Sequence, residues 1–353
     1  MADTTLVTAS QVQKWDANYF AEYVRNSGFK PYMSRGSTSV ICAKYQLTDV
    51  GKTINIPLVT RLSGAGVTGA TKLEDAEEAL NNYNHAISID WTRNGVLITK
   101  DQEHYTEMSL RSAAREMLTT WAMEDLRDKI IAALGSINGV AYGTATEGQK
   151  DTWVAANSDR VLFGDAIGNG GYTDHSADLL TVTAAMTLGA AEISLMKRIA
   201  KNASPHIRPM KTMDSTGREF FVMFTDSRCF RDLKGDTVIT QANREARPRD
   251  VESNPIFQDG DLVYDGVIIR EIPEIASLVA VGGTSAAVSP AYMCGAQSVG
   301  VAWGQEPKST TDTRDYGFRR GVGVEFADGV EKLVFNSVQH GVVTGYFGAA
   351  ADA

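Results

Sequence analysis

Two stretches near the start of the chain alternate between apolar and polar side chains with a period of two. In residues 53–60 (TINIPLVT), Ile54, Ile56 and Leu58 alternate with their neighbours, and residues 85–92 (HAISIDWT) continue in the same way. This period is typical of a strand with one buried face, and the internal proline of the first stretch favours an edge or partly solvated strand. The pattern predicts two long antiparallel strands, TINIPLVTRL and NHAISIDWT, with a loop tip between them.

A helical period begins soon after the second strand. From Asp101 to Leu134, apolar residues recur at i, i+3 and i+4, namely Leu110, Ala113, Ala114, Met117, Leu118, Trp121, Ala122, Leu126, Ile130, Ile131 and Leu134. This spacing predicts one amphipathic helix, and Gly135 provides its C-terminal stop. At 1.5 Å per residue the helix would be about 50 Å long. We therefore expect a spine along which other elements pack.

The remaining segments predict shorter elements. Residues 135–175 are rich in Gly, Asn and Asp and favour loops, and a second helix is expected over Thr183–Ala203. EFFVMFTD predicts a buried strand, followed by a short helix with Asp226 or Ser227 as its N-cap. The last third of the chain is nearly all strand and turn, which favours a mixed α and β fold.

The first 45 residues have little sustained periodicity. Their one amphipathic piece, Val12–Val24, carries Trp15, Tyr19 and Phe20. Aromatic side chains on an extended arm need a surface to bury against, so we expect this arm to contact another subunit.

The loop between the two strands contains a dinucleotide-binding pattern. Gly64, Gly66 and Gly69 have the G-x-G-x-x-G spacing, and Asp90 ends the second strand in the place of a ribose-binding acid. A nucleotide-binding oxidoreductase is therefore one hypothesis. However, the preceding strand alternates, whereas the first strand of such a fold is continuously apolar. The segment after the glycines also begins with four acids, which would repel a pyrophosphate. We favour glycines that give flexibility to a loop tip.

Composition and charge place the chain among ordinary globular proteins. It has 353 residues, is 43% hydrophobic and 22% charged, and carries a net charge of −9. No stretch approaches the roughly 18 consecutive apolar residues of a membrane span, so we expect no membrane partner. The three cysteines are far apart, which predicts reduced packing residues.

We expect no catalytic, cofactor-binding or metal-binding residues. The five histidines lack metal-ligand spacing, and Ser227 lies outside a G-x-S-x-G elbow. Asp259, Asp261 and Asp265 lack the ligand spacing of a calcium loop and favour a hairpin turn. A basic stretch from Lys197 to Arg218 leaves two interpretations open: a solvated helix face and loop, or ion pairing with another subunit or with DNA.

The order of these elements resembles the major capsid proteins of tailed bacteriophages, which have the Hong Kong 97-type fold. Several segments resemble the coliphage N-four-like major capsid family, namely LEDAEEAL with AISIDWTRNGVLI, FFVMFTDSRCFRDLKGD, NPIFQDGDLVYDGVIIREIPEI, CGAQSVGVAWGQ and DYGFRRGVGVEF. The resemblance covers most of the chain from about Val50 onward. It implies an α+β fold with four parts: an N-terminal arm (1–45), an extended two-stranded loop (46–92), a peripheral domain with the spine helix (93–175, completed by 305–353) and an inserted axial domain (176–304).

The resemblance implies a shell-building protein that is not an enzyme. Its copies would form hexamers and pentamers of an icosahedral shell around the double-stranded DNA of a tailed bacteriophage. Scaffold, portal and decoration proteins would be further partners, and the virion capsid would be assembled in the cytoplasm of the host bacterium. An encapsulin-like nanocompartment, which encloses a cargo protein, is the alternative within the same fold.

The extended loop is expected to lie on a neighbouring subunit. The acids that follow its glycine tip are Glu74, Asp75, Glu77 and Glu78. Their expected counterparts on the neighbour are Arg314, Arg319 and Arg320. Exposed ion pairs contribute only about 0–1 kcal/mol each, but many symmetric copies of one contact can decide whether a shell closes.

Overall fold

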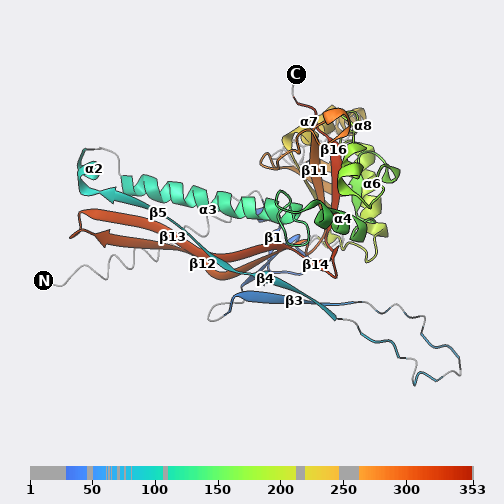
Figure 1. Cartoon of the computed structure of the whole chain (residues 1–353), viewed down its shortest axis with the longest axis horizontal. Coiled ribbons are helices and arrows are strands. Elements are labelled where there is room, and N and C mark those ends of the chain that lie inside the picture. Colours follow the sequence, from blue (N-terminus) through green and yellow to red (C-terminus); the bar gives the residue numbers. More distant parts are fainter. Residues whose placement is uncertain are drawn as a thin grey trace.

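Two β-sheets, one long and narrow and one shorter, divide most of the chain between them (Figure 1). The structure is a computed structural model. It describes residues 29–45, 51–60, 62, 64, 66–69, 72–74, 77–80, 82–105, 110–211, 219–245 and 262–351. The predicted contact residues Trp15, Tyr19, Phe20 and Asp75 lie outside these ranges.

The long sheet has five strands in the order β1-β2-β12-β13-β5. Their bounds are Met33–Ser34 (β1), Ile41–Tyr45 (β2), Asp90–Thr99 (β5), Val299–Arg314 (β12) and Arg319–Lys332 (β13). β13 pairs antiparallel with both β12 and β5, whereas β2 pairs parallel with β12. Val322, Val324 and Phe326 on β13 are buried. Because side chains alternate along a strand, Gly321 and Gly323 lie on the opposite face.

Helix α3 (Leu110–Gly135) covers one face of the long sheet (Figure 1). Its residues Leu118, Ala122, Leu126 and Ile130 are buried at every fourth position, as expected for an amphipathic helix. They share one hydrophobic core with the buried side chains of β13. Burying a large apolar side chain contributes about 1.5–3 kcal/mol, so this stripe holds the helix on the sheet.

The single helix predicted from Asp101 to Leu134 is two helices in the structure. α2 spans Lys100–Tyr105 and α3 begins at Leu110; residues 106–109 lie outside the described ranges. The apolar stripe of the sequence also begins only at Leu110, and α2 has no buried residue. The start of α2 is tied instead to the β12–β13 turn, because Lys100 N donates to Phe318 O (2.9 Å). Among the described residues, no helix combines the length and apolarity that a membrane crossing requires.

The second sheet has seven strands, six of them in the order β6-β16-β11-β8-β10-β9, with β7 paired to β8. Their bounds are Val161–Phe163 (β6), Met210–Lys211 (β7), Glu219–Thr225 (β8), Leu262–Tyr264 (β9), Val267–Glu271 (β10), Val288–Cys294 (β11) and Val342–Gly348 (β16). All seven residues of β11 and of β16 are buried, because helices and loops cover both faces of the sheet. The predicted strand EFFVMFTD is confirmed as β8.

Among the described residues, five helices and two short 3-10 turns belong to this second part of the molecule. They are α4 (Glu147–Ala156), α5 (His175–Leu180), α6 (Ala190–Asn202), α7 (Ser227–Gly235), α8 (Thr237–Glu245), η2 (Ile167–Asn169) and η3 (Gly283–Ser285). A further 3-10 turn, η1 (Lys30–Tyr32), precedes β1 of the long sheet. Asp226 is confirmed as the N-cap of α7, since its Oδ1 accepts the N–H of Cys229 (2.9 Å).

Residues 135–175 were predicted as loops, and this is wrong for part of the segment. They contain α4, β6 and the first residue of α5. α4 begins at a T-x-x-Q pattern, where Gln149 Oε1 accepts the N–H of Thr146 (2.9 Å); this capping-box signature was readable in the sequence. Trp153 and Val154 then bury the helix against the second sheet.

The helix predicted over Thr183–Ala203 is shorter in the structure, where α6 begins at Ala190. Gly189 is its N-cap, and Asp236 Oδ2 accepts the N–H of Ala190 (2.7 Å). A carboxylate that is distant in sequence therefore sets the start of this helix.

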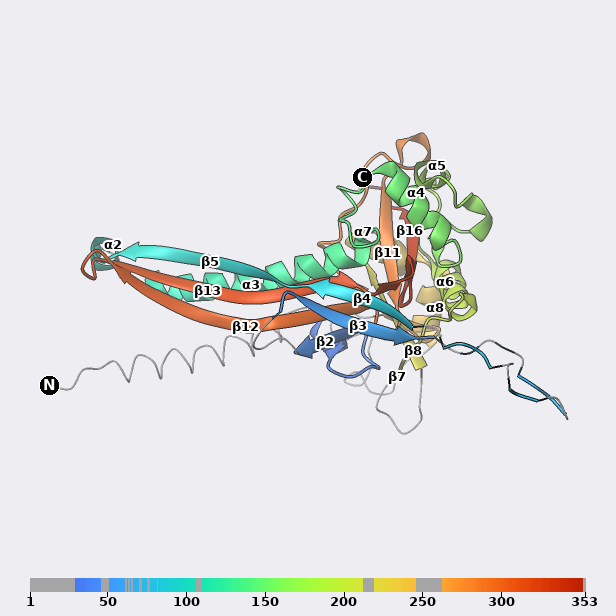
Figure 2. The ribbon, with the colours of Figure 1, turned by 60° about the horizontal axis from the view of Figure 1, so that its bottom comes forward.

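The β3 strand (Thr53–Val59) and the β4 strand (Asn82–Ser88) form a separate antiparallel ribbon, as the sequence predicted. β4 leads into β5 through Ile89, and the ribbon leaves the molecule beside the junction of the two sheets (Figure 2). A smaller ribbon pairs β14 (Val334–Phe335) with β15 (Val338–Gln339).

At two places, the sheet in which a strand lies does not match the predicted domain boundaries. β16 (342–348) lies in the second sheet with β6, although residues 305–353 were expected to complete the peripheral domain. β12 already enters the long sheet at Val299, before the expected boundary at residue 304. The chain crosses between the sheets more often than its sequence indicated.

Candidate functional site

The root of the β3–β4 ribbon packs on the face of the long sheet opposite α3, which we call the ribbon face. The ribbon contributes four isoleucines and the rest of the chain four apolar side chains to one small core, namely Ile54, Ile56, Ile87 and Ile89 with Ala302, Ala327, Leu333 and Phe335. Each ribbon isoleucine is at most 7% exposed. This core fixes the direction in which the ribbon leaves the molecule.

Glycines of the sheet allow the ribbon to approach closely. They are Gly300, Gly304 and Gly329. A Cβ on Gly300 would lie 2.6 Å from Cδ1 of Ile87, and a Cβ on Gly329 would overlap the main-chain oxygen of Ser88. The absence of side chains at these positions is therefore a condition for seating the ribbon.

One acid of β13 adds polar contacts at the same root. Glu331 Oε1 accepts the N–H of Ser88 (3.4 Å), and Glu331 Oε2 lies 3.3 Å from Nε2 of His85. The ribbon is thus held by both apolar and polar contacts.

Beyond its root, the ribbon presents apolar side chains to solvent. Val59, Leu62, Leu73 and Leu80 are each 58–61% exposed. Among the described residues, none covers these side chains. Several large apolar side chains exposed on one segment indicate a surface that a partner covers.

The glycine motif at the loop tip has the conformation of a turn and not of a nucleotide site. Gly66 and Gly69 have φ values of 68° and 70°, in the left-handed region that glycine tolerates. The described residues between 72 and 80 are not helical, so no helix N-terminus is available for a pyrophosphate. β3 and β4 are antiparallel, whereas the dinucleotide fold has parallel strands. The oxidoreductase hypothesis is therefore wrong at the residues that suggested it.

The predicted loop acids have different surroundings. Glu74 and Glu77 are exposed. Glu78 Oε2 instead accepts the N–H of Gly64 (2.6 Å) and joins the two arms of the loop. Two of the described acids are therefore free to contact another molecule, and the third also stabilises the loop itself.

The three predicted arginine counterparts lie around the β12–β13 turn, far from the loop. Each already has an acid within its own chain: Arg314 with Asp312 (2.6 Å), Arg319 with Asp315 (4.0 Å) and Arg320 with Glu103 of α2 (3.7 Å). These exposed or partly exposed pairs contribute about 0–1 kcal/mol each, so exchange with other partners costs little. The loop and this turn lie at opposite ends of the molecule (Figures 1 and 2), and one chain cannot bring them together.

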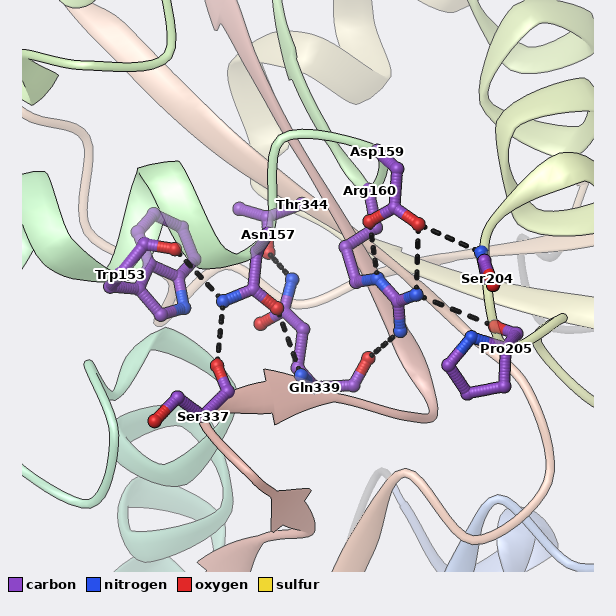
Figure 3. Close-up of polar contacts among 9 residues, drawn as sticks. All are labelled: Trp153, Asn157, Asp159, Arg160, Ser204, Pro205, Ser337, Gln339 and Thr344. Carbon is purple, nitrogen blue, oxygen red and sulfur yellow. Dashed lines mark hydrogen bonds and ion pairs between the residues drawn. The ribbon is translucent and has the colours of Figure 1, made fainter. Parts of the chain in front are cut away.

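Sequence reasoning missed a buried polar network that links parts of the second sheet (Figure 3). Arg160, fully buried, donates to Gln339 O (2.7 Å) and is paired with Asp159 (2.9 Å). Burial by itself would raise the pKa of Asp159, but hydrogen bonds from Arg160 and from the N–H of Ser204 hold it below its ordinary value. The carboxylate of Asp159 therefore stays ionised at neutral pH.

Asn157 extends the same network toward β15 (Figure 3). Its side-chain amide donates to Trp153 O (2.9 Å) and Ser337 O (3.1 Å), and its Oδ1 accepts the N–H of Gln339 (2.9 Å). Together with Arg160 it ties α4 and β6 to the last strands of the chain. No local sequence pattern marks residues whose partners are so distant.

A second buried charge, Lys332, lies where the two sheets meet. The residue is 2% exposed, and its Nζ donates to Leu134 O (3.1 Å) in the last turn of α3. The same Nζ lies 5.6 Å from the ring centroid of Trp153. Burial lowers the pKa of Lys332 to about 7. The lysine therefore caps the spine helix from the end of β13.

The structure groups one set of carboxylates that the sequence did not single out. Oxygens of Glu147, Asp151 and Asp174 lie within 4.8 Å of one another. Asp151 accepts the N–H of His175 (2.9 Å), and Asp174 caps α5. Burial, together with the nearby Lys150, lowers the pKa of His175 to about 4. Asp151 and Asp174 are therefore partners of main-chain N–H groups, and Glu147 lies 3.8 Å from the ammonium group of Lys150.

The remaining sequence candidates have local roles. Asp265 (φ 46°) and Gly266 (φ 70°) form the two-residue turn between β9 and β10, which confirms a hairpin at that point; Asp259 and Asp261 lie outside the described residues. Lys197 of the basic stretch pairs with Asp265 (2.8 Å), whereas Arg198, Lys201 and Arg208 are exposed. The three cysteines are free and buried, as predicted.

Comparisons with known proteins cover almost the whole chain. A family model described as phage capsid protein matches residues 3–346. The major capsid protein of Pseudomonas phage KPP25 is 27% identical over an alignment of 368 positions, which covers 97% of this chain and 94% of that protein. Among solved structures, the capsid of cyanophage Pam1 superposes with a TM-score of 0.86 at 45% identity, covering 93% of this chain and 94% of that one. The capsid of Ralstonia phage GP4 superposes with a TM-score of 0.71 at 21% identity, covering 91% and 90%.

Proposed function

The chain belongs to the phage capsid protein family, and from this membership we propose how its copies hold together and what their shell encloses. It is a phage major capsid protein with the Hong Kong 97-type fold, and its copies form the shell. The further proposals concern the contact between neighbouring subunits, the contents of the shell and the partners of assembly.

Each extended loop is proposed to lie on the next subunit of the shell. The observation that carries this proposal is the ribbon itself: its root is fixed by a small core, but its apolar side chains beyond the root are exposed. The extended loop and the β12–β13 turn, beside which the three arginines lie, are at opposite ends of one chain (Figure 1). In a ring of copies, each loop can reach the distal end of a neighbour, and repetition of one contact closes hexamers and pentamers.

The long sheet with α3 is proposed to act as the peripheral part of the subunit and the second sheet as the axial part. The polar network around Arg160 and the lysine cap at Lys332 support this division. The network stiffens the second sheet, and the lysine joins the end of β13 in the long sheet to the spine helix. Neither group is placed for chemistry on a bound substrate, which supports a purely structural role.

The shell is proposed to enclose the double-stranded DNA of a tailed bacteriophage and to assemble in the cytoplasm of the host bacterium. The net charge of −9 disfavours tight binding to DNA, which suits a shell in which DNA must slide during packaging. Arg198, Lys201 and Arg208 could supply weak, non-specific phosphate contacts. Scaffold, portal and decoration proteins would be the other partners of assembly.

Microscopy of the purified protein tests the central proposal. Negative staining should show closed shells, and particles from infected cells should contain nuclease-protected DNA. A cargo protein in place of DNA would support the encapsulin-like alternative. Sedimentation as a stable monomer of 38.1 kDa at every protein and salt concentration would contradict shell formation.

A further inference from the structure

A cavity of about 270 Å³ lies between the last turn of α3 and the second sheet. One face of the sheet forms its floor. Pro290 and Tyr292 are two residues apart on β11 and therefore share a face, and Tyr346 of β16 pairs directly with Pro290. α3 ends against this face, because a Cβ on Gly135 would lie 3.0 Å from the hydroxyl of Tyr292. We call this cavity the tyrosine pocket.

Three tyrosines line the pocket, and none of their hydroxyls has a hydrogen-bond partner among the described residues. Tyr292 and Tyr346 are 6% and 3% exposed, and Tyr142 is partly buried. A buried tyrosine hydroxyl usually has a partner. Outside the pocket this holds for Tyr172, whose hydroxyl donates to Ile167 O (3.0 Å). The hydroxyls in the pocket therefore indicate a partner that the chain itself does not supply.

The three hydroxyls are hydrogen-bond donors that lie near one another. Burial raises the pKa of Tyr292 and of Tyr346, and the neighbouring hydroxyl of Tyr142 raises both further. An influence of this kind requires groups that are close in space. Because all three hydroxyls stay protonated at neutral pH, the group that fits them is an acceptor such as a carbonyl oxygen.

The rest of the lining is apolar. Apart from the tyrosines, every lining residue is aliphatic, proline or glycine, and Ile131, Ile275 and Leu278 supply the largest of these side chains. Among the described residues, no charged side chain lines the pocket. Burial of a charge without a partner is costly, so a molecule that fits here is uncharged and mostly apolar.

The size and the mouth of the pocket suit a small organic molecule. An engineered cavity of about 150 Å³ holds benzene, so this larger cavity has room for an aromatic ring with a short substituent. Four small lining residues are also exposed to solvent, namely Ala132, Ala141, Gly143 and Ala276. Their short side chains leave the mouth open, and entry requires no movement of a helix or strand.

We propose that the tyrosine pocket binds a small, uncharged, apolar organic molecule through a carbonyl oxygen that accepts from the tyrosine hydroxyls. The apolar body of the molecule packs against Ile131 and Leu278. The proposal goes beyond shell formation and does not depend on it, because one chain supplies the whole lining. A molecule in this place contacts α3, β11 and β16 together, so its binding stabilises the folded subunit where its two parts meet.

Ligand-observed fluorine NMR of unassembled full-length subunits tests the chemistry of the pocket. The probe is para-trifluoromethyl acetophenone, a neutral aromatic ketone, and its signal should broaden as protein is added. Para-trifluoromethyl benzoate has a similar size and a charge, and should bind at least about tenfold more weakly. Para-trifluoromethyl ethylbenzene lacks the acceptor and should bind about 3–10-fold more weakly. Equal binding of the three probes would overturn the proposed chemistry.

Removal of single hydroxyls tests their role as donors. Tyr292→Phe and Tyr346→Phe should each weaken binding of the ketone by about 3–10-fold and leave binding of the ethylbenzene probe unchanged. The urea midpoint should not fall in either variant, because the hydroxyls have no partner within the described chain. Tyr264→Phe, on β9 of the same sheet and outside the pocket, should change neither affinity. Unchanged affinity for the ketone in both pocket variants would contradict the proposal.

A blocking variant distinguishes the pocket from other places on the surface. Ala132→Leu puts a larger side chain at the mouth and keeps a good helix former, so binding of the ketone should be lost while circular dichroism stays the same. Ala155→Leu, at an exposed position of α4 outside the pocket, should bind the ketone as the unmodified protein does. Full binding by a folded Ala132→Leu variant, or no binding by the unmodified protein, would overturn the pocket and leave shell formation standing.

Discussion

Replacement of Lys332 by methionine should change how the stability of the subunit depends on pH. The side chain is 2% exposed, and its Nζ donates to Leu134 O (3.1 Å) at the end of α3. Burial lowers its pKa from 10.5 to about 7. Methionine has a similar shape and no charge, so Lys332→Met removes the titration and keeps most of the packing.

The expected magnitude follows from the two pKa values of Lys332. Between pH 7 and 10.5 the unfolded chain holds this proton and the folded chain does not. Because the unfolded state binds more protons in this window, the free energy of unfolding rises with pH. At 1.36 kcal/mol per pKa unit, the full difference corresponds to about 5 kcal/mol. Relaxation around a buried charge reduces such values, and we expect about 2–5 kcal/mol.

The assay is equilibrium urea unfolding of unassembled subunits, followed by tryptophan fluorescence between pH 7 and 9.5. The unfolding free energy of the unmodified protein should rise with pH relative to that of Lys332→Met. The variant also leaves Leu134 O without its donor, which costs about 1–3 kcal/mol at every pH. The test is therefore how the difference in unfolding free energy between the two proteins changes with pH, and not the size of that difference at one pH. Lys201→Met, at an exposed position of α6, keeps Lys332 and should show the same rise with pH as the unmodified protein. A difference between the unmodified protein and Lys332→Met that stays constant or falls with pH would refute the reasoning.

Three further changes test the ribbon and the core. Gly329→Ala places a Cβ against the main-chain oxygen of Ser88 in β4 and should lower the unfolding free energy, measured by urea titration, by about 1–3 kcal/mol. Gly143→Ala is the control and should have no effect, because its Cβ meets nothing within 4 Å. Reversal of Glu74 and Glu77 to lysine should abolish the shell fraction on a gradient without changing circular dichroism, and normal shells would show that these charges are only solvated. Asp328→Asn removes the ion pair with Lys129 of α3, whose Nζ lies 2.7 Å from Oδ1 of Asp328. Because Lys129 is partly exposed, the unfolding free energy measured in urea should fall by about 1–3 kcal/mol. An unchanged unfolding midpoint would show that the pair does not contribute.

Several elements were determined by the sequence alone. The period-two alternation in residues 53–60 and 85–92 predicted the β3–β4 ribbon, because a strand with one solvated face imposes that period on its own residues. The apolar stripe from Leu110 predicted α3, and the sequence limited the N-cap of α7 to Asp226 or Ser227, of which the structure has Asp226. In each case the physical cause lies within a few residues of the element. The order of elements, compared with a known family, then indicated a capsid protein.

Other features were decided only by tertiary structure. Glycine at positions 66 and 69 serves a local backbone conformation, but Gly300 and Gly329 are needed because a ribbon lies on them, and their own neighbours in sequence do not show it. Lys332 and its acceptor are 198 residues apart. Their meeting depends on the register of a long sheet and on how α3 crosses it. Local periods and caps are encoded in adjacent residues, whereas contacts of this range arise when the strands and helices pack together.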